Sequence, residues 1–211
     1  RDSTQGLSQD KPPGEWPVLA DFAAHPRAVA AGLTEAEVVA LRLYTTPAAF
    51  KLINGPLRDI DRAAAHPLAA TVCLIVQALL KLRKLEAPDH SPAAPPRLWR
   101  GMRNVRAPQE LMRIGGTELA PLSFSSDVEL AASFASSRSA LLFMINSDVS
   151  DVDWLRRGIS IGWLSTVPTE CEYLWPPRTY MRPTGRTKQV ELAGGQACTI
   201  VEVTPDWGAA G

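Results

Sequence analysis

The hydrophobic positions of this chain change their spacing near its middle. Before residue 86 they recur every three to four residues, as in helices, whereas after residue 97 they form short runs rich in β-branched and aromatic residues. Helices first and strands afterwards predict an α+β fold, in which a helical layer packs on one or two mainly antiparallel sheets.

Three helical segments are expected in the first part. Thr34 and Glu37 have the spacing of a capping box, which predicts a helix from residue 35 into the low 40s. A second segment around residues 50–53 is expected to end at Asn54-Gly55-Pro56, a helix stop and turn. The third, residues 68–85, is apolar nearly all the way round and is therefore expected to be buried.

Short strands dominate the second part. They are predicted at residues 98–102, 119–124, 140–145, 159–164, 172–182 and 197–203, with two short helices at 108–114 and 127–136. The second of these helices follows a capping-box pattern from Ser126 to Glu129.

Composition indicates how the chain is divided. Residues 1–15 are polar and are expected to form a flexible tail, and 211 residues suffice for one domain, which we place at 16–205. A proline-rich connector, residues 86–96, separates the helical part at 16–86 from a β-rich core at 97–205. Because the chain begins at Arg1 rather than with methionine, we interpret it as a processed or excised piece.

Charge and hydropathy narrow the possible partners. Lys plus Arg equals Asp plus Glu at 22 each, so the chain lacks the basic footprint of a nucleic-acid binder. No run is apolar for the roughly 18 residues of a membrane span, and we expect a soluble protein, whether a secreted effector or an intracellular one. The three cysteines are widely separated and are interpreted as free thiols rather than metal ligands.

Familiar catalytic motifs are missing from the sequence. It contains no dinucleotide-binding Gly-x-Gly-x-x-Gly, phosphate-binding loop, His-Glu-x-x-His or Gly-x-Ser-x-Gly. Its three histidines lie beside or near prolines in linkers and helix starts, where a general base has no formed pocket. We therefore expect neither a metal site nor histidine chemistry.

Three short motifs remain as candidates for chemistry. Arg100 lies inside an apolar strand, where a guanidinium needs a carboxylate or phosphate partner, although a structural ion pair would also satisfy it. Ser123 and Ser125 share one face of a later strand. Glu170 and Glu172 are also two residues apart, so in a strand both carboxylates point the same way, and the repulsion between them raises the pKa of one of the two unless a cation compensates.

Together, and in this order, these motifs resemble the signature of the arginine-specific mono-ADP-ribosyltransferases: an arginine on the first core strand, Ser-x-Ser, and Glu-x-Glu. The resemblance extends over most of residues 33–203. It implies an ADP-ribosyltransferase-like fold, with the N-terminal helical layer packed on a two-sheet, mainly antiparallel core, and NAD as co-substrate without a metal. One departure is Phe124, at a position where the family commonly has a small hydroxyl residue.

The resemblance also implies roles for the motif residues. Arg100 would hold a phosphate or the nicotinamide ribose, and the backbone of Gly101 would bind the nicotinamide carboxamide. Ser123 would support Glu172, and Ser125 would complete the serine motif.

Further binding residues follow from the same resemblance. Phe134 would pack on the nicotinamide ring, Arg138 would reach a phosphate, and Tyr44, Asn54 and Arg58 would close over the dinucleotide from the helical layer. The loop at 164–169 corresponds to the loop with which the family meets its protein substrate.

The resemblance predicts transfer of ADP-ribose from NAD to arginine side chains of a protein acceptor, with release of nicotinamide. We expect the protein to be a monomer. Glu172 would stabilise the oxocarbenium-like ribose as the glycosidic bond breaks, and Glu170 would pair with the acceptor guanidinium and accept its proton. Three alternatives stay open: an NAD glycohydrolase that uses water, a catalytically silent NAD-binding or interaction domain of the same fold, and an unrelated α+β protein.

Overall fold

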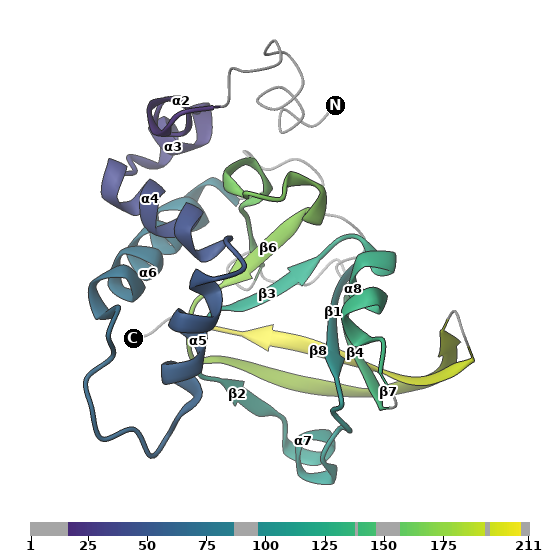
Figure 1. Cartoon of the computed structure of the whole chain (residues 1–211). Helices are drawn as coiled ribbons and strands as arrows, with labels where there is room; N and C mark the ends of the chain where they lie inside the picture. The colour runs from purple at the N-terminus through teal and green to yellow at the C-terminus, as the bar shows by residue number, and fades with distance from the viewer. Residues whose placement is uncertain (1–16, 87–96, 138, 147–156, 193–194, 208–211) are drawn as a thin grey trace.

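The N-terminal helices α2 to α6 lie on one side of the molecule and the sheet on the other (Figure 1). The computed structural model describes residues 17–86, 97–137, 139–146, 157–192 and 195–207. The expected tail at 1–15 and nearly all of the proline-rich connector lie outside these residues. The helical layer comprises α2 (Leu19–Ala23), α3 (Pro26–Ala31), α4 (Glu35–Tyr44), α5 (Ala49–Arg58), α6 (Ala69–Arg83) and η2 (Lys84–Glu86).

The predicted start of α4 is confirmed. Thr34 is its N-cap: the Thr34 hydroxyl accepts a hydrogen bond from the Glu37 amide, and the Glu37 carboxylate accepts one from the Thr34 amide at 2.7 Å. Lys81 of α6 pairs with the same carboxylate at 2.8 Å. A local capping motif therefore also joins two helices of the layer.

The prediction that the second helical segment stops at Asn54-Gly55-Pro56 is wrong. Helix α5 continues through Pro56 to Arg58. Two tertiary contacts hold this last turn, because Leu57 packs against the core and Arg58 pairs with Glu118. These contacts outweigh the one helical hydrogen bond that proline cannot donate.

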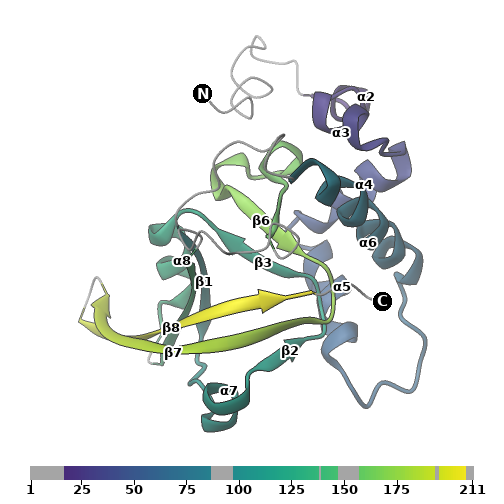
Figure 2. The ribbon, with the colours of Figure 1, turned by 180° about the vertical axis from the view of Figure 1, so that it is seen from behind.

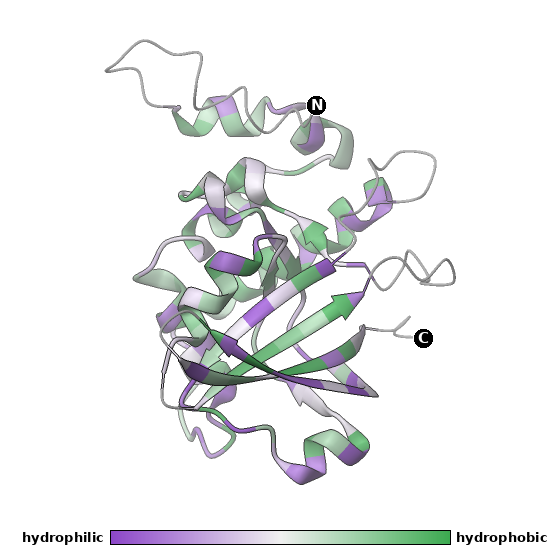
Figure 3. Ribbon diagram, turned by 90° about the vertical axis from the view of Figure 1, so that its right-hand side faces the viewer, coloured by the Kyte–Doolittle hydropathy of each residue, from purple (hydrophilic) through white to green (hydrophobic). Residues whose placement is uncertain are grey.

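Helix α6 is less buried than its composition predicts. Ile75, Ala78, Leu79 and Leu82 form its buried side, while Leu80 is 48% exposed. One face is thus covered by the core, and the other stays at the surface of the layer. Mixed hydrophobic and hydrophilic positions along the helices and strands are visible in Figure 3.

The described strands form one mixed sheet, and the predicted division into two sheets is not confirmed. The strand order is β2-β7-β8-β4-β1-β3-β6-β5, and among the described pairs only β4–β8 is parallel. The strands are β1 (Arg97–Arg103), β2 (Gly116–Glu118), β3 (Leu122–Ser125), β4 (Ala140–Asn146), β5 (Ile159–Ser160), β6 (Glu172–Trp175), β7 (Thr179–Leu192) and β8 (Gln196–Asp206).

A narrow junction connects two parts of this sheet. Strands β1 and β3 share a single register pair, Trp99 with Ser125, whereas β1 and β4 pair over seven positions from Arg97 to Arg103. This one pair between Trp99 and Ser125 joins the two parts into a single sheet. The β7–β8 hairpin extends past the rest of the sheet (Figures 1 and 2).

Three predicted strands have different limits in the structure. The segment predicted at 119–124 contains the end of a turn and β3, and the one at 172–182 is divided into β6 and β7. After Ile159–Ser160 the chain turns into a short 3-10 helix, η4 (Gly162–Leu164), and a second one, η5 (Pro168–Glu170), precedes β6. These turns follow runs of apolar residues that the sequence pattern does not distinguish from strands.

The helical layer and the sheet share one core. Leu41 and Leu79 from the helices lie in the same buried cluster as Phe124 and Trp175 from the strands, and the rings of Phe124 and Trp175 meet edge to face at 5.4 Å. No helix in the described ranges is long and apolar enough to cross a membrane.

Two further helices flank the sheet, α7 (Gln109–Ile114) and α8 (Val128–Ala135). Asp127, not Ser126, caps α8: its carboxylate accepts hydrogen bonds from the Glu129 and Leu130 amides at 2.8 and 3.1 Å. Helix α8 packs directly on β1, so closely that a Cβ at Gly101 would lie 1.9 Å from the Ala131 carbonyl oxygen. Any side chain at Gly101 would therefore displace the helix.

Candidate active site

A cavity of about 310 Å³ lies between α5, α8 and the β1–β3–β6 part of the sheet. Its volume is at the small end of the range for small-molecule sites. Every proposed site residue within the described ranges lines it: Tyr44, Asn54, Arg58, Arg100, Gly101, Ser123, Ser125, Phe134, Glu170 and Glu172. The proposed phosphate-binding Arg138 lies outside those ranges.

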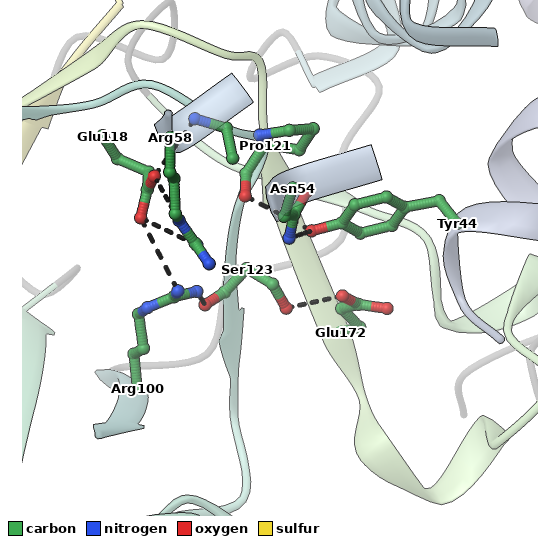
Figure 4. A network of polar contacts seen from close by, with 9 residues as sticks. Tyr44, Asn54, Arg58, Arg100, Glu118, Pro121, Ser123 and Glu172 are labelled. Carbon is green, nitrogen blue, oxygen red and sulfur yellow. Dashed lines mark hydrogen bonds and ion pairs between the residues drawn. The ribbon is translucent and has the colours of Figure 1, made fainter. Parts of the chain in front are cut away.

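Glu172 is held at the buried end of the cavity by Ser123. The two residues lie on neighbouring strands, and since Ser123 is opposite Leu174, Glu172 is its diagonal neighbour on the same face. The Ser123 hydroxyl donates a hydrogen bond of 2.5 Å to Glu172 Oε1, and Glu172 is 7% exposed (Figure 4). The carboxylate is thus fixed by strand geometry and a charge-assisted hydrogen bond.

The environment of Glu172 favours its protonated form. Burial, with a smaller contribution from the charge of Glu170, raises the pKa of Glu172 to about 7. The Ser123 hydrogen bond and the charge of Arg100 act in the opposite direction. A cationic group beside this carboxylate would add to the opposing effect and favour ionisation.

Glu170 lines the same cavity from a different kind of backbone. The expectation that both glutamates lie in one strand is wrong, because Glu170 ends η5 and β6 begins at Glu172. Between them Cys171 has a left-handed backbone with φ of 44°. This turn, rather than the two-residue period of a strand, brings both carboxylates to the cavity. Burial raises the pKa of Glu170 as well.

Ser125 fixes the backbone at this turn. Its hydroxyl donates to the Glu170 carbonyl oxygen at 2.6 Å and accepts from the Asp127 amide at 2.9 Å. The second serine of the motif therefore ties the loop of Glu170 to the start of α8. Ser123 and Ser125 share a face, as expected, but one holds a carboxylate and the other a main chain.

The loop before Glu170 is also attached to the helical layer. Thr45 follows α4, and its hydroxyl accepts a hydrogen bond from the Thr166 amide at 3.0 Å. In return, the Thr166 hydroxyl donates to the Thr45 carbonyl oxygen at 2.9 Å. Arg42 adds a hydrogen bond of 3.0 Å to the Leu164 carbonyl oxygen.

Arg100 lies at the narrow junction of the sheet. Its Nη1 donates to the Ser123 carbonyl oxygen at 2.8 Å, and its Nη2 lies 3.8 Å from Glu118 Oε2. The side chain thus bridges β1 and β3 beyond their single register pair, at the wall of the cavity (Figure 4). Burial lowers the pKa of Arg100, while Glu118 is the strongest of the groups opposing this shift.

The helical layer contributes three more polar side chains. Arg58 pairs with Glu118 in a two-pronged arrangement, with Nε–Oε1 and Nη2–Oε2 distances of 2.9 and 3.0 Å. Asn54 donates to the Tyr44 hydroxyl at 3.5 Å, and this hydroxyl donates to the Pro121 carbonyl oxygen at 3.3 Å. Burial raises the pKa of Tyr44 to about 12, so its hydroxyl keeps its proton at neutral pH.

Two walls of the cavity are apolar. Phe134 of α8 is 47% exposed and Phe50 of α5 is 37% exposed, and both line the cavity. Gly101 lies in the wall below α8, where the close approach of the helix also requires glycine. The structure thus gives a packing reason for Gly101, alongside the ligand contact that the resemblance implies.

Sequence reasoning missed several residues of this site. Cavity-lining residues outside the three motifs are Thr45, Pro47, Phe50, Leu130 and Ala131, while Trp99 and Phe124 adjoin motif residues but had no role assigned to them. Glu118 was missed too, since a lone glutamate in a short strand has no distinguishing pattern. Within the described ranges, histidine, cysteine, aspartate and glutamate do not gather in groups that could hold a metal ion.

Similarity to known proteins is limited to structure. No protein-family model matches the sequence, and no curated protein matches it either. The ADP-ribosyltransferase HopU1 of Pseudomonas syringae has a similar fold, with a TM-score of 0.60, 16% identity and coverage of 90% of this chain and 88% of that one.

Two ligand-bound structures are also similar. Exoenzyme S of Pseudomonas aeruginosa, solved with carba-NAD, has a TM-score of 0.52 and 22% identity, covering 87% of this chain and 86% of that chain. Vis, an ADP-ribosyltransferase from Vibrio splendidus solved with agmatine, has a TM-score of 0.54 and 18% identity, covering 88% and 82% respectively. At these identities the comparisons establish that this chain has the ADP-ribosyltransferase fold.

Proposed function

We propose that this protein is an NAD-dependent ADP-ribosyltransferase that transfers ADP-ribose to arginine side chains of a protein acceptor. The observation that carries the proposal is the cavity itself, where Arg100, the Ser123–Glu172 pair and Glu170 converge from separate elements. Within the shared fold, this convergence supports chemistry on NAD rather than a catalytically silent site.

Glu172 is the residue suited to cleavage of the nicotinamide–ribose bond. Bond breaking develops positive charge on the ribose, and an ionised carboxylate held beside it stabilises that charge without reorganising. Burial and the Ser123 hydrogen bond keep Glu172 in one position. Arg58 and Arg100, with guanidinium groups at the cavity wall, are suited to the phosphates and ribose of NAD.

Glu170 is suited to the acceptor. A guanidinium with a pKa above about 12 is a poor nucleophile until it is oriented and begins to lose a proton. Glu170 lies two residues from Glu172 and reaches the cavity from a half-buried loop, with a raised pKa. It can therefore pair with an incoming arginine and accept its proton as the new bond forms.

The test uses NAD labelled in its adenosine part, with agmatine as acceptor, and also measures nicotinamide release. The wild-type protein is expected to label agmatine, Glu170→Gln to lose the label while still releasing nicotinamide, and Glu172→Gln to lose both. Nicotinamide release without any labelled adduct in the wild type would indicate a glycohydrolase. NAD binding with neither product would indicate a silent domain.

A further inference from the structure

Glu118 is a partly buried acid between the two arginines of the cavity wall. Its side chain is 14% exposed, and its carboxylate binds Arg58 through both oxygens, at 2.9 and 3.0 Å, while Oε2 also lies 3.8 Å from Arg100 Nη2 (Figure 4). One carboxylate thus joins a helix of the N-terminal layer to the first core strand.

The backbone holds Glu118 as firmly as it holds the arginines. Glu118 ends β2, its carbonyl oxygen accepts a hydrogen bond from the Arg178 amide at 2.8 Å, and its Oε1 accepts another from the Ala120 amide at 3.0 Å. Arg58, the Ala120 amide and Arg100 together lower the pKa of Glu118 against the effect of burial, so it stays ionised at neutral pH.

Glu118 contacts the cavity wall without being part of its described lining. Arg58 and Arg100 line the cavity, and Glu118 pairs with both of their guanidinium groups. Its bonds to Arg58 use Nε and Nη2, and the Arg100 Nη1 bond goes to Ser123. Arg58 Nη1 and Arg100 Nε take no part in these contacts.

Charge explains why two arginines need such support. The guanidinium groups of Arg58 and Arg100 repel each other, and the charge of Arg58 accordingly lowers the pKa of Arg100. One shared carboxylate compensates for this repulsion and leaves a net charge of plus one for two guanidinium groups. An anionic diphosphate therefore still meets a positive and preorganised wall.

We propose that Glu118 is a positioning residue for the diphosphate of NAD. Its carboxylate pairs with both Arg58 and Arg100 and holds their guanidinium groups at the cavity wall, and so sets the affinity for the ADP-ribose part of NAD. This inference rests on the proposed function, because that function supplies the diphosphate.

The test is calorimetric titration of ADP-ribose, which contains the diphosphate, and of nicotinamide, which does not, into the wild type and Glu118→Gln. If Glu118→Gln costs the diphosphate one charge-assisted contact with the two arginines, the Kd for ADP-ribose is expected to rise about tenfold. The Kd for nicotinamide should stay within about twofold of the wild-type value. In steady-state kinetics, KM for NAD should rise by the same factor while kcat changes little.

Glu202→Gln is the matched control. Glu202 is also buried and paired with an arginine, Arg186, but this pair lies on the β7–β8 hairpin and does not line the cavity. We expect this variant to bind ADP-ribose as the wild type does. Thermal unfolding of both variants, together with Glu118→Asp as a second substitution that keeps the charge but shortens the side chain, separates loss of fold from loss of positioning.

An Arg58→Ala background distinguishes positioning from a general structural role. If Glu118 acts through the arginines, Glu118→Gln must weaken ADP-ribose binding less in this background than in the wild type. Equal effects in both backgrounds, or ADP-ribose bound as tightly by Glu118→Gln as by the wild type, would overturn the inference. Failure of the proposed function is a separate result, namely a wild type that binds ADP-ribose but releases no nicotinamide from NAD.

Discussion

Glu170 and Glu172 are two residues apart, but their surroundings differ in almost every respect. Glu172 begins a strand, is 7% exposed and receives a hydrogen bond from Ser123. Glu170 ends a 3-10 turn, is partly exposed, and is held through its backbone by Ser125. Where two carboxylates share a site, such differences assign them different tasks. The buried one is suited to stabilising charge, and the exposed one to meeting the acceptor.

The largest expected effect tests the buried side of this comparison. Glu172→Gln keeps the shape of the side chain but removes the charge that, in the proposed reaction, stabilises the cationic ribose. We expect kcat for nicotinamide release to fall about 100- to 1,000-fold. Binding of NAD should change far less, which calorimetry can show. Retention of more than a tenth of the wild-type rate would assign the stabilising charge to another group.

A second prediction concerns stability and pH. The folded-state pKa of Glu172 is raised from its ordinary 4.5 to about 7, so the folded protein binds this proton more tightly than the unfolded chain. Protonated Glu172 therefore contributes about 3 kcal/mol to the free energy of unfolding. This contribution is complete below about pH 4.5 and is lost as the pH rises through about 7.

Glu172→Gln has no carboxyl group at this position and therefore lacks the pH-dependent contribution of Glu172 to the free energy of unfolding. Its free energy of unfolding, compared with that of the wild type, should therefore improve by about 3 kcal/mol over the same pH range. Urea titrations of both proteins at several pH values provide the measurement. A difference that stays constant across the range would contradict the assigned burial of the carboxylate.

A smaller effect is expected when the support of Glu172 is removed. Ser123→Ala deletes the hydrogen bond to the carboxylate, which costs about 1.5 kcal/mol or roughly tenfold in kcat. Because this bond favours the ionised form, its loss should also move the acidic limb of kcat/KM to higher pH. Ser136→Ala, at a serine outside the cavity lining, is the control. An unchanged pH profile in Ser123→Ala would separate Ser123 from the ionisation of Glu172.

The smallest expected effect on kinetics concerns the loop that carries Glu170, the more exposed of the two glutamates. Thr166→Val keeps the side-chain shape but removes the hydroxyl that donates to the Thr45 carbonyl oxygen. With the loop of Glu170 loosened, KM for agmatine should rise about fivefold, the equivalent of one hydrogen bond. Nicotinamide release in the absence of acceptor should stay unchanged. If release fell as much as transfer, the two glutamates would not be supported independently.

Some features of this molecule could be predicted from sequence because their physics is local. The Thr34–Glu37 capping box fixes the start of α4 without help from the rest of the chain. Likewise, the two-residue period places Ser123 and Ser125 on one face of β3. The α+β composition also follows from hydrophobic spacing alone.

Features set by tertiary contacts were not predictable in this way. Helix α5 passes through Pro56 because Leu57 and Arg58 find partners far along the chain. The turn at Cys171, and the role of Glu118 between two arginines, likewise depend on neighbours that the sequence does not identify. The residues of the cavity were found from their resemblance to a family signature, not from periodicity.

Arg100 both lines the cavity and bridges two strands whose backbones share one register pair. The proposed ligand contact and the bridge between the two strands therefore depend on the same side chain. An inactive Arg100 variant should be assessed for misfolding before its loss of turnover is attributed to chemistry.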